Sequence, residues 1–351
     1  MIDYAIIGCG HIASKHIEAI RYAEGAQLVA ICDTNPGRLA AMTAAEQVTG
    51  YTDIAEMLEK QPSIQVVCIC TPSGLHIEHA LAAANAGKHL IIEKPMTLTL
   101  EDADILIRAA SRNQVKTAVV HPNRFRPAVQ KLKTALEHEW FGKLSHASVS
   151  VRWNRSQAYY DQAAWRGTKQ MDGGVLMNQA IHSLDLLQWL MGPVECVKSL
   201  VDTRIRHIEA EDVAVAALRF TNGALGTVEA TTAIYEENLE ETIGVFGEYG
   251  YAVISGKTAN WIKHWRCSSM SDEQIAAWIS EVDRDPFGVP GHQIIIQDMV
   301  HAIKDNRDPI VTASDGRQAI QLVLEIDKGK EERLIAGSHG GRDLYYGAGI
   351  N

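Results

Sequence analysis

The sequence predicts an α/β protein with an N-terminal doubly wound parallel sheet and a C-terminal α+β domain. Three observations predict it. Strand-like apolar runs alternate with helical segments over the first 120 residues, a glycine-rich turn follows the first run, and later strand candidates follow one another without helices between them. Strands separated by helices form parallel sheets covered on both faces, whereas consecutive strands form antiparallel or mixed sheets.

The first half contains five continuous apolar runs, which is typical of buried strands. These expected strands are 4–7, 27–32, 65–70, 89–92 and 116–120. Between them we expect helices over 11–22, 38–46, 76–86 and 100–113. This order predicts a sheet whose ligands lie at the carboxyl ends of its strands.

After residue 120 the regular alternation of predicted strands and helices ends. Helices are expected over 127–139, 175–191, 293–304 and 314–330, and strands over 145–151, 194–204, 213–220, 225–233, 241–247 and 251–255. Asn222-Gly223 is a hairpin signal between two of these strands. We therefore expect a first domain over 1–121, a second over 122–331, and a polar, glycine-rich tail over 332–351.

Composition and charge exclude several classes of function. The net charge of −10 is opposite to what nucleic-acid phosphates require. No apolar run reaches the roughly 18 residues of a membrane helix, and the N-terminus has no basic segment of a signal peptide. The six cysteines form no CxxC pair, which argues against a zinc site or a disulfide framework. We expect a cytoplasmic protein with reduced thiols, no metal, and no nucleic-acid or membrane partner.

The glycine motif Gly8-Cys9-Gly10-His11-Ile12-Ala13 lies between the first strand and the first helix. Its glycines permit a tight turn, and the helix N-terminus attracts a pyrophosphate, so Gly8, Gly10, His11 and Ile12 are expected to bind a dinucleotide. Asp33 ends the second strand and suits the ribose hydroxyls, which favours NAD over NADP. The alternatives are a plain glycine turn and a helix-capping Asp33. Arg38 would weaken the preference for NAD, although its position suits a solvated face.

Two further segments follow strands at the same edge of the sheet. One contains Thr71, Pro72 and His76, and the other is Glu93-Lys94-Pro95. Their place predicts contact with the cofactor. The alternatives are a turn with a helix cap in the first segment and an ordinary surface lysine in the second.

A helix in the second domain carries Asn178, His182 and Asp185 at a spacing that puts them on one stripe. Because the rest of this helix is very apolar, the stripe is expected to line a cavity, with a solvent face as the alternative. Oxidation of an alcohol needs a base for its proton. His182 suits that role near neutral pH, with Lys94 stabilising the developing alkoxide. Lys94 as the base is the alternative.

The glycine motif, Thr71-Pro72-Ser73-x-x-His76, Glu93-Lys94-Pro95 and Gly173-Gly174…His182-x-x-Asp185 together resemble the glucose–fructose oxidoreductase / inositol dehydrogenase / rhizopine catabolism (Gfo/Idh/MocA) family. The resemblance extends from residue 2 to about residue 330. It implies an N-terminal Rossmann domain and a C-terminal domain with a large open-faced sheet. In the family that sheet usually mediates dimers and tetramers, so a homodimer or homotetramer is expected.

Shorter motifs resemble a subset of that family, the bacterial UDP-N-acetylglucosaminuronate 3-dehydrogenases of surface-polysaccharide synthesis. They are Asn123-Arg124-Phe125, Tyr159-Tyr160-Asp161, Trp165-Arg166-Gly167-Thr168 and the stretch 172–179. The resemblance implies that the substrate is bound by Arg124, Tyr159, Tyr160, Trp165, Arg166, Asn178 and Asp185. Many family members have Asp at position 178, so a His–Asp dyad there is in doubt.

Cations and aromatic rings gather between residues 152 and 169. Arg152, Arg155, Arg166 and Lys169 around Tyr159 and Trp165 suit a diphosphate and a stacked uracil, or else a solvated or subunit-contact loop. The expected activity is NAD-dependent oxidation of a ring hydroxyl, at C3, of a UDP-sugar uronate. The alternatives are a dehydrogenase of a free sugar or inositol and a non-catalytic NAD-binding regulator. If NADH stays tightly bound, a 2-oxoacid co-substrate would be needed for turnover.

Overall fold

The first domain is built on a six-stranded parallel sheet. The computed structural model describes residues 1–331, and the expected tail over 332–351 lies outside them. The strand order is β3-β2-β1-β4-β5-β6, and every neighbouring pair is parallel. The strands are β1 (Ile2–Ile7), β2 (Ala26–Cys32), β3 (Thr49–Tyr51), β4 (Val66–Ile69), β5 (His89–Ile92) and β6 (Thr117–Val119).

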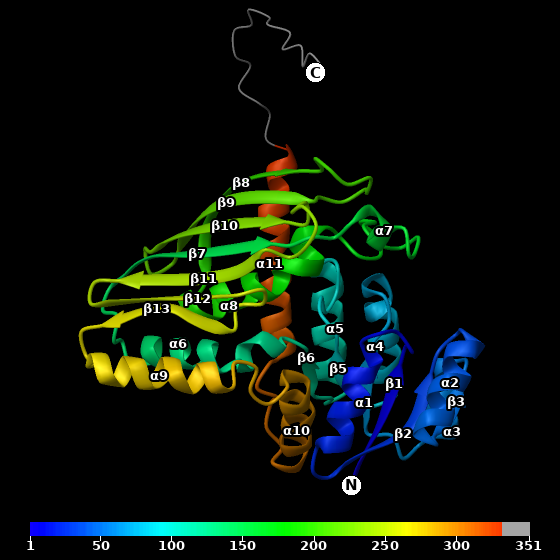
Figure 1. Cartoon of the computed structure of the whole chain (residues 1–351). Helices are drawn as coiled ribbons and strands as arrows, with labels where there is room; N and C mark the ends of the chain where they lie inside the picture. The colour runs from blue at the N-terminus through cyan, green and yellow to red at the C-terminus, as the bar shows by residue number, and fades with distance from the viewer. Residues whose placement is uncertain (332–351) are drawn as a thin grey trace, which may run out of the picture.

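Helices cover both faces of this sheet (Figure 1). They are α1 (Ala13–Tyr22), α2 (Pro36–Glu46), α3 (Ile54–Lys60), α4 (His76–Asn85) and α5 (Leu100–Arg112), with a short 3₁₀ turn η1 (Ser73–Leu75) before α4. The central strand β4 is buried along its whole length. This arrangement confirms the predicted doubly wound sheet, because continuous apolar runs can be accommodated only where both faces are covered.

The second domain carries a seven-stranded mixed sheet in the order β13-β12-β11-β7-β10-β9-β8. Only the central pair β7 and β10 is parallel, and the other pairs are antiparallel. The strands are β7 (Leu144–Arg152), β8 (Val194–Asp202), β9 (Val213–Phe220), β10 (Leu225–Thr231), β11 (Glu240–Gly247), β12 (Gly250–Ser255) and β13 (Trp261–Cys267). The predicted mixed sheet is confirmed.

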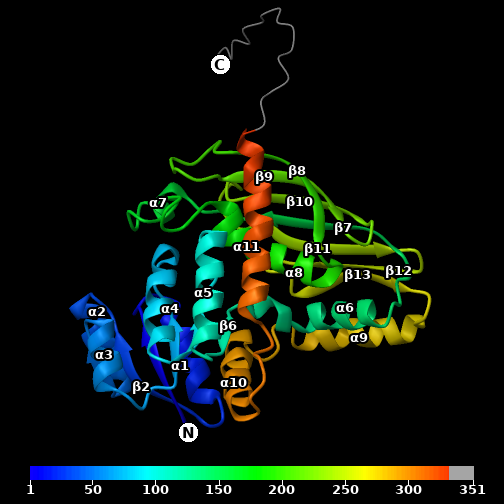
Figure 2. The same ribbon diagram turned by 180° about the vertical axis from the view of Figure 1, so that it is seen from behind.

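One face of this sheet packs against helices, and the other face is open (Figures 1 and 2). The remaining helical segments are η2 (Pro122–Phe125), α6 (Pro127–Glu137), α7 (Gln157–Tyr160), η3 (Val175–Ala180), α8 (Ile181–Met191), α9 (Asp272–Arg284), α10 (Gly291–Lys304), α11 (Ala313–Asp327) and η4 (Lys328–Glu331). The segment η3 is a π-helix. The open face exposes Leu200, Val215, Leu225 and Tyr251. In the part of the chain that the structure describes, no helix has the length and apolar character needed to cross a membrane.

Helix α10 lies on the first domain, although the sequence division at residue 121 assigned it to the second. Ile295, Ile296, Met299 and Val300 share a hydrophobic cluster with β1 and α1. The Tyr4 hydroxyl also donates to the Ile296 carbonyl at 3.2 Å. The apolar face of α10 covers a side of the parallel sheet that the first 121 residues leave uncovered, so the two domains share a core.

The sequence analysis missed β3, α3, β13 and α9. The strand β3 has only three residues, of which two are exposed, so it carries no apolar run. The helix α9 buries only Ile275 and Val282 along its length. Short or mostly exposed elements give weak periodicity, and their neighbours in space stabilise them.

Candidate active site

The turn between β1 and α1 is shaped for close approach of a ligand. Gly8 has a φ of +100°, and a Cβ there would lie 2.7 Å from the Cys70 carbonyl oxygen. Only glycine fits this position. Helix α1 begins just beyond the turn, and the first amides of a helix have no partner within it and carry positive partial charge. Gly10, His11 and Ile12 therefore lie at a position that suits a pyrophosphate.

Asp33 follows β2 and lies beside this turn. Its carboxylate accepts hydrogen bonds from the Cys9 amide at 2.6 Å, the Asn35 amide at 2.7 Å and the Arg38 guanidinium at 3.1 Å. Burial alone would raise the pKa of Asp33, but these hydrogen bonds outweigh it and hold the pKa below its usual value. The charged carboxylate suits a ribose diol and repels a 2′-phosphate. Arg38 is exposed, as its position suggested, and its guanidinium pairs with Asp33.

His76 joins two loops and does not face an open site. Its Nδ1 lies 2.7 Å from the Pro95 carbonyl oxygen, and its Nε2 lies 2.8 Å from the Thr71 carbonyl oxygen. The ring is 1% exposed, and burial lowers the pKa of His76. The prediction that His76 contacts the cofactor is therefore corrected: it holds the Thr71-Pro72 turn against the loop that carries Lys94.

Lys94 follows β5 and reaches into the second domain. Its Nζ donates to the main-chain carbonyl oxygen of Asn178 at 2.8 Å. Asn178 lies in the π-helix η3, which continues directly into α8. Burial lowers the pKa of Lys94, while the carboxylates of Glu93 and Asp172 oppose this change. The lysine is thus anchored at the junction between the two domains.

His182 lies in the first turn of α8, four residues beyond Asn178. Burial and then the positive charge of Lys94 hold the pKa of His182 well below its usual value. Its Nδ1 is buried and has no hydrogen-bond partner among residues 1–331. The structure therefore brings Lys94 and His182 together, as the sequence analysis expected.

Asp185 and Arg124 form a buried ion pair. The guanidinium of Arg124 donates to both oxygens of Asp185, at 2.8 Å and 2.6 Å, and to Asp315 at 3.1 Å. Both residues were expected to bind substrate. The structure corrects this, because two carboxylates hold the guanidinium and Asp185 is only 2% exposed. The pair fixes α8 at Asp185, which lies three residues after His182 in the same helix.

His121 is a site residue that the sequence analysis missed. Its ring packs edge-on against His182, with ring centroids 6.4 Å apart, and its Nδ1 lies 3.7 Å from Asp185. Burial lowers the pKa of His121. The only available signal was its place after the last strand of the first domain, beside the Asn123-Arg124-Phe125 motif.

In the loop over residues 153–169 the guanidinium of Arg155 lies 5.4 Å from the ring centroid of Tyr159. Arg152 does not join this group, because it ends β7 and pairs with Glu229 and Glu240. The guanidinium of Arg166 lies 4.2 Å from the ring centroid of Tyr159 and 4.8 Å from that of Trp165. The Nε of Arg166 is buried without a hydrogen-bond partner in the described chain. Tyr160 differs from the expectation, because it is buried and its hydroxyl donates to Thr232 at 3.2 Å. Tyr159, Trp165 and Arg166 are thus half-buried in this loop, whereas Tyr160 is buried.

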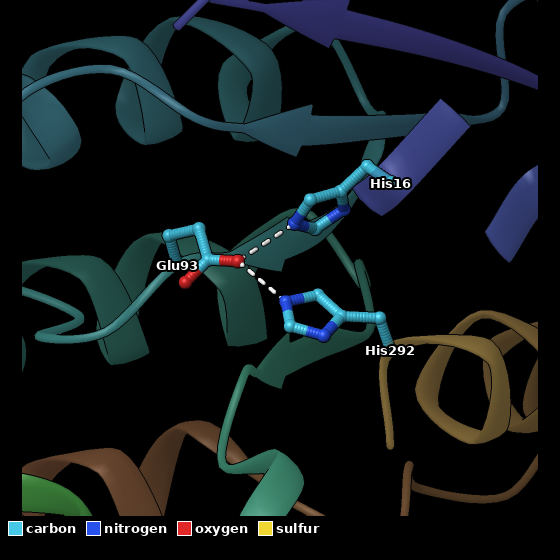
Figure 3. A group of neighbouring side chains, drawn as sticks. All are labelled: His16, Glu93 and His292. Atoms are coloured by element: carbon cyan, nitrogen blue, oxygen red, sulfur yellow. Dashed lines mark hydrogen bonds and ion pairs between the residues drawn. The ribbon is translucent and has the colours of Figure 1, made fainter. Parts of the chain in front are cut away.

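Three side chains meet around the carboxylate of Glu93, the residue before Lys94 (Figure 3). One oxygen of Glu93 lies 2.8 Å from His16 Nε2 and 3.1 Å from His292 Nε2. We call His16, Glu93 and His292 the Glu93 cluster. Burial alone would raise the pKa of Glu93, but the two histidine hydrogen bonds outweigh it and hold the pKa well below its usual value. The cluster links α1, the loop after β5 and α10.

The Glu93 cluster has the residue types of a metal site, but its hydrogen bonds favour another assignment. A ligating histidine turns its Nε2 lone pair to the metal and donates its Nδ1–H to a second partner. His16 Nδ1 is buried and has no partner among residues 1–331. A buried N–H without an acceptor is less common in proteins than an unused acceptor. We therefore assign both histidines as Nε2–H donors to Glu93 and assign no metal.

Comparison with protein families matches both domains. Residues 2–121 match the profile described as "Oxidoreductase family, NAD-binding Rossmann fold". Residues 129–253 match the "GFO/IDH/MocA C-terminal domain". The first match confirms that the glycine turn belongs to an NAD-binding domain.

Known proteins of similar sequence and structure include sugar and inositol dehydrogenases. Myo-inositol 2-dehydrogenase of Thermotoga maritima is 28% identical over 341 residues, which cover 93% of this chain and 96% of that protein. The WlbA dehydrogenase from Bordetella pertussis, solved with NADH and UDP-GlcNAcA, is 37% identical, with a TM-score of 0.90 and coverage of 94% and 95% of the two chains. The WlbA dehydrogenase from Chromobacterium violaceum, solved with the same ligands, is 34% identical, with a TM-score of 0.88 and coverage of 94% of each chain.

Proposed function

Because the chain belongs to the Gfo/Idh/MocA family of NAD-dependent sugar dehydrogenases, we propose that it oxidises the C3 hydroxyl of a UDP-sugar uronate such as UDP-N-acetylglucosaminuronate. The observation that carries this proposal is the meeting of Lys94 and His182 at the junction of the two domains. The likeness to two dehydrogenases solved with NADH and UDP-GlcNAcA supports the choice of substrate.

The residues present fit NAD. The Gly8 turn admits no side chain, and Asp33 stays charged beside it. Gly10, His11 and Ile12 would hold the pyrophosphate. Asp33 would bind the adenosine ribose, and Thr71 and Pro72 would line the edge of the site beside Lys94. NAD supplies the hydride acceptor when it is bound.

The protein would then manage the proton and the developing charge. His182 is neutral near pH 7, and in the tautomer that carries its proton on Nδ1 its Nε2 can accept the proton of the sugar hydroxyl. The ammonium of Lys94, fixed by the Asn178 carbonyl, would stabilise the alkoxide as that proton leaves. The side-chain amide of Asn178 can position a sugar hydroxyl without adding charge.

The loop over 153–169 supports a nucleotide sugar over a free sugar. Arg166 stacks between Tyr159 and Trp165 and keeps a buried Nε unpartnered in the described chain. A guanidinium between aromatic rings suits a diphosphate and a stacked base. Replacing Arg166 by Ala should raise KM for the nucleotide sugar far more than KM for a free sugar. An equal effect on both substrates would reject the diphosphate role.

Steady-state assays test the activity. The protein is incubated with NAD and, separately, with UDP-N-acetylglucosaminuronate, UDP-N-acetylglucosamine, free N-acetylglucosamine and myo-inositol, and NADH formation is followed by absorbance. Each assay is repeated with a 2-oxoacid, which would regenerate NAD if the enzyme retains NADH. We expect turnover with the uronate. Turnover with myo-inositol alone would favour the alternative that the likeness to myo-inositol 2-dehydrogenase supports. A silent Lys94→Ala substitution beside intact NAD binding would favour a regulator.

We also propose that copies of the chain associate through the open sheet face as a dimer or tetramer. That face exposes Leu200 and Val215, which are cross-strand neighbours, and stacks the ring of His146 on that of Phe246. Apolar patches of this kind mark interaction surfaces. Light scattering should show a smaller assembly for Val215→Lys. The control Tyr235→Lys lies outside the strands of the sheet and should leave the assembly unchanged.

A further inference from the structure

We propose that Asp172 is a positioning residue that joins the nucleotide-binding loop to Lys94 through Asn178. The inference rests on the function proposed above and deepens it: the same side chain orients the turn after Arg166 and the lysine that faces the reacting hydroxyl. The sequence analysis quoted Asp172 only as part of a motif and gave it no role.

The first link runs from Asp172 to the loop. One carboxylate oxygen accepts a hydrogen bond from the Gly167 amide at 2.8 Å, and the Asp172 amide donates to the Thr168 carbonyl at 3.1 Å. Gly167 has a φ of +70°, and a Cβ there would lie 2.7 Å from Ile208, so the turn is tightly packed. Because Gly167 directly follows Arg166, Asp172 fixes the backbone that carries this guanidinium.

The second link runs from Asp172 to the lysine. Its other oxygen accepts a hydrogen bond from the Asn178 side-chain amide. The main-chain carbonyl of the same Asn178 accepts the hydrogen bond of Lys94 Nζ. The chain Asp172–Asn178–Lys94 is therefore continuous. An ionised carboxylate only accepts hydrogen bonds, so N–H donors on both oxygens match the ionised form of Asp172.

The third observation concerns charge. Asp172 is 1% exposed, so little water screens its carboxylate from neighbouring charges. It favours the charged form of Lys94, as does Glu93, whereas Arg155 disfavours that form. Burial raises the pKa of Asp172, and the charges of Lys94 and Arg166 are among the effects that oppose this rise. Asp172 thus lies between the cation of the loop and the cation of the catalytic site.

The segment before Asp172 also contacts the cofactor side of the site. The Gly74 amide donates to the Met171 carbonyl at 3.0 Å, and a Cβ on Gly74 would lie 2.4 Å from the Gln170 carbonyl oxygen. The 3₁₀ turn after β4 is therefore pressed against this segment. If the loop over 153–169 moves when a nucleotide sugar binds, these contacts would shift Lys94 and the 3₁₀ turn after β4 together.

Asp172→Asn in the full chain tests this role, because it keeps the size of the side chain and removes its charge. The first measurement is the pH dependence of Lys94 acetylation, followed by peptide mass spectrometry on the NAD-loaded protein without any sugar. We expect the reactivity curve of Lys94 to move to lower pH, since an opposite charge beside it has been lost. The second measurement is kcat with UDP-N-acetylglucosaminuronate, which should fall about 10²-fold from misplacement of the lysine, with KM for NAD unchanged.

Matched variants separate positioning from stability. Asp283→Asn removes an exposed carboxylate from α9, outside the loop over 153–169, and should match the wild type in both measurements. Asp172→Glu restores the charge and should return the Lys94 curve toward the wild-type position. Asn178→Ala removes the side-chain amide that donates to Asp172 and should lower kcat although Asp172 is still present. Thermal unfolding identifies any variant that fails to fold.

The outcomes distinguish this inference from the proposed function. If Asp172→Asn matches Asp283→Asn in both Lys94 reactivity and kcat, the positioning role is overturned. If the wild type oxidises no nucleotide sugar but the Lys94 curve still moves in Asp172→Asn, the proposed substrate is wrong and the link stands.

Discussion

His182 and Lys94 are buried ionisable groups whose charged forms the site disfavours. Burial, reinforced by the charge of Lys94, keeps His182 neutral, and burial lowers the pKa of Lys94. A base must be unprotonated before it can accept a proton, so this pairing suits oxidation near neutral pH. Two cations facing the same hydroxyl would instead repel each other beside a positively charged cofactor.

Substitution of either residue should act on the chemical step. We expect His182→Ala to lower kcat by about 10²–10⁴-fold, the usual contribution of a general base. Lys94→Ala should lower kcat without preventing NAD binding, because the Gly8 turn and Asp33 remain. Stopped-flow kinetics and NAD titration measure the two effects. An unchanged kcat in His182→Ala would mean that another group takes the proton.

The depressed pKa of His182 has a consequence for pH. In the unfolded chain His182 has its ordinary pKa of 6.5, whereas in the folded protein its pKa is well below that value. The unfolded state therefore binds more protons in that window, and the contribution of His182 to stability falls as pH falls below about 6.5. Acid unfolding of His182→Gln, compared with the wild type, should show a weaker pH dependence in that window. Equal slopes would contradict the assignment.

The ion pair between Arg124 and Asp185 should matter for stability. Asp185→Ala leaves a buried guanidinium with one carboxylate fewer, and breaking a buried pair costs about 3–5 kcal/mol of unfolding free energy. Denaturant unfolding measures this loss. The control Asp104→Ala breaks a solvent-exposed pair with Arg317 and should cost far less. Equal losses would show that burial of the Arg124 pair is unimportant.

Among the elements, the junction of η3 and α8 decides the geometry of the site. The π-helix begins where Glu211 accepts the Val175 amide through its main chain and the Leu176 amide through its side chain, each at 2.9 Å. π-Helical turns are often found at functional sites. Here the turn carries Asn178, whose carbonyl holds Lys94. A regular α-helix over 175–191 was expected, so the local change of period is a correction.

The turn from β1 to α1 is the second element on which function depends. Gly8→Ala adds a Cβ against the Cys70 carbonyl and forces a positive φ on alanine. We expect a loss of about 1–3 kcal/mol in unfolding free energy and weaker NAD binding, measured by denaturation and titration. Gly87→Ala also has a positive φ, but its Cβ meets no atom within 4 Å. It should cost stability without changing NAD affinity, and weaker NAD binding in both variants would count against the steric reason.

At the scale of the whole molecule, the Glu93 cluster joins α10, which comes late in the chain, to α1, which comes near its start. His16 comes from α1, Glu93 from the loop before α5, and His292 from α10, which lies on the first domain. Because Lys94 follows Glu93 directly, the position of the lysine depends on a helix nearly 200 residues away. The cluster therefore makes the packing of α10 on the first domain a condition for the site.

Removal of His292 should show this dependence. His292→Ala deletes a donor to the Glu93 carboxylate, and a hydrogen bond to a charged group contributes about 1.5–3 kcal/mol. Unfolding free energy and kcat should both fall. His292→Gln keeps a donor and should recover part of each loss. The control His301→Ala removes an exposed histidine from the same helix, and a loss as large as that of His292→Ala would contradict the role of the cluster.

The sequence by itself determined the parallel sheet, the mixed sheet, the NAD turn and the two proposed catalytic residues. These features are local: continuous apolar runs, glycines at a tight turn, and a polar stripe on an apolar helix leave direct traces in the order of residues. Arg124, Asp185, Tyr160 and His76 look identical in sequence to ligand-binding residues, because residue type does not tell which partner a side chain faces.

Only the tertiary structure decided those partners. It paired Arg124 with Asp185, brought His121 beside His182, placed Asp172 behind Lys94, and folded α10 back onto the first domain. These contacts join residues that are distant in the chain, and each depends on how apolar faces pack together. Burial then sets the charge state of every group in the site, and burial is a property of the packed molecule alone.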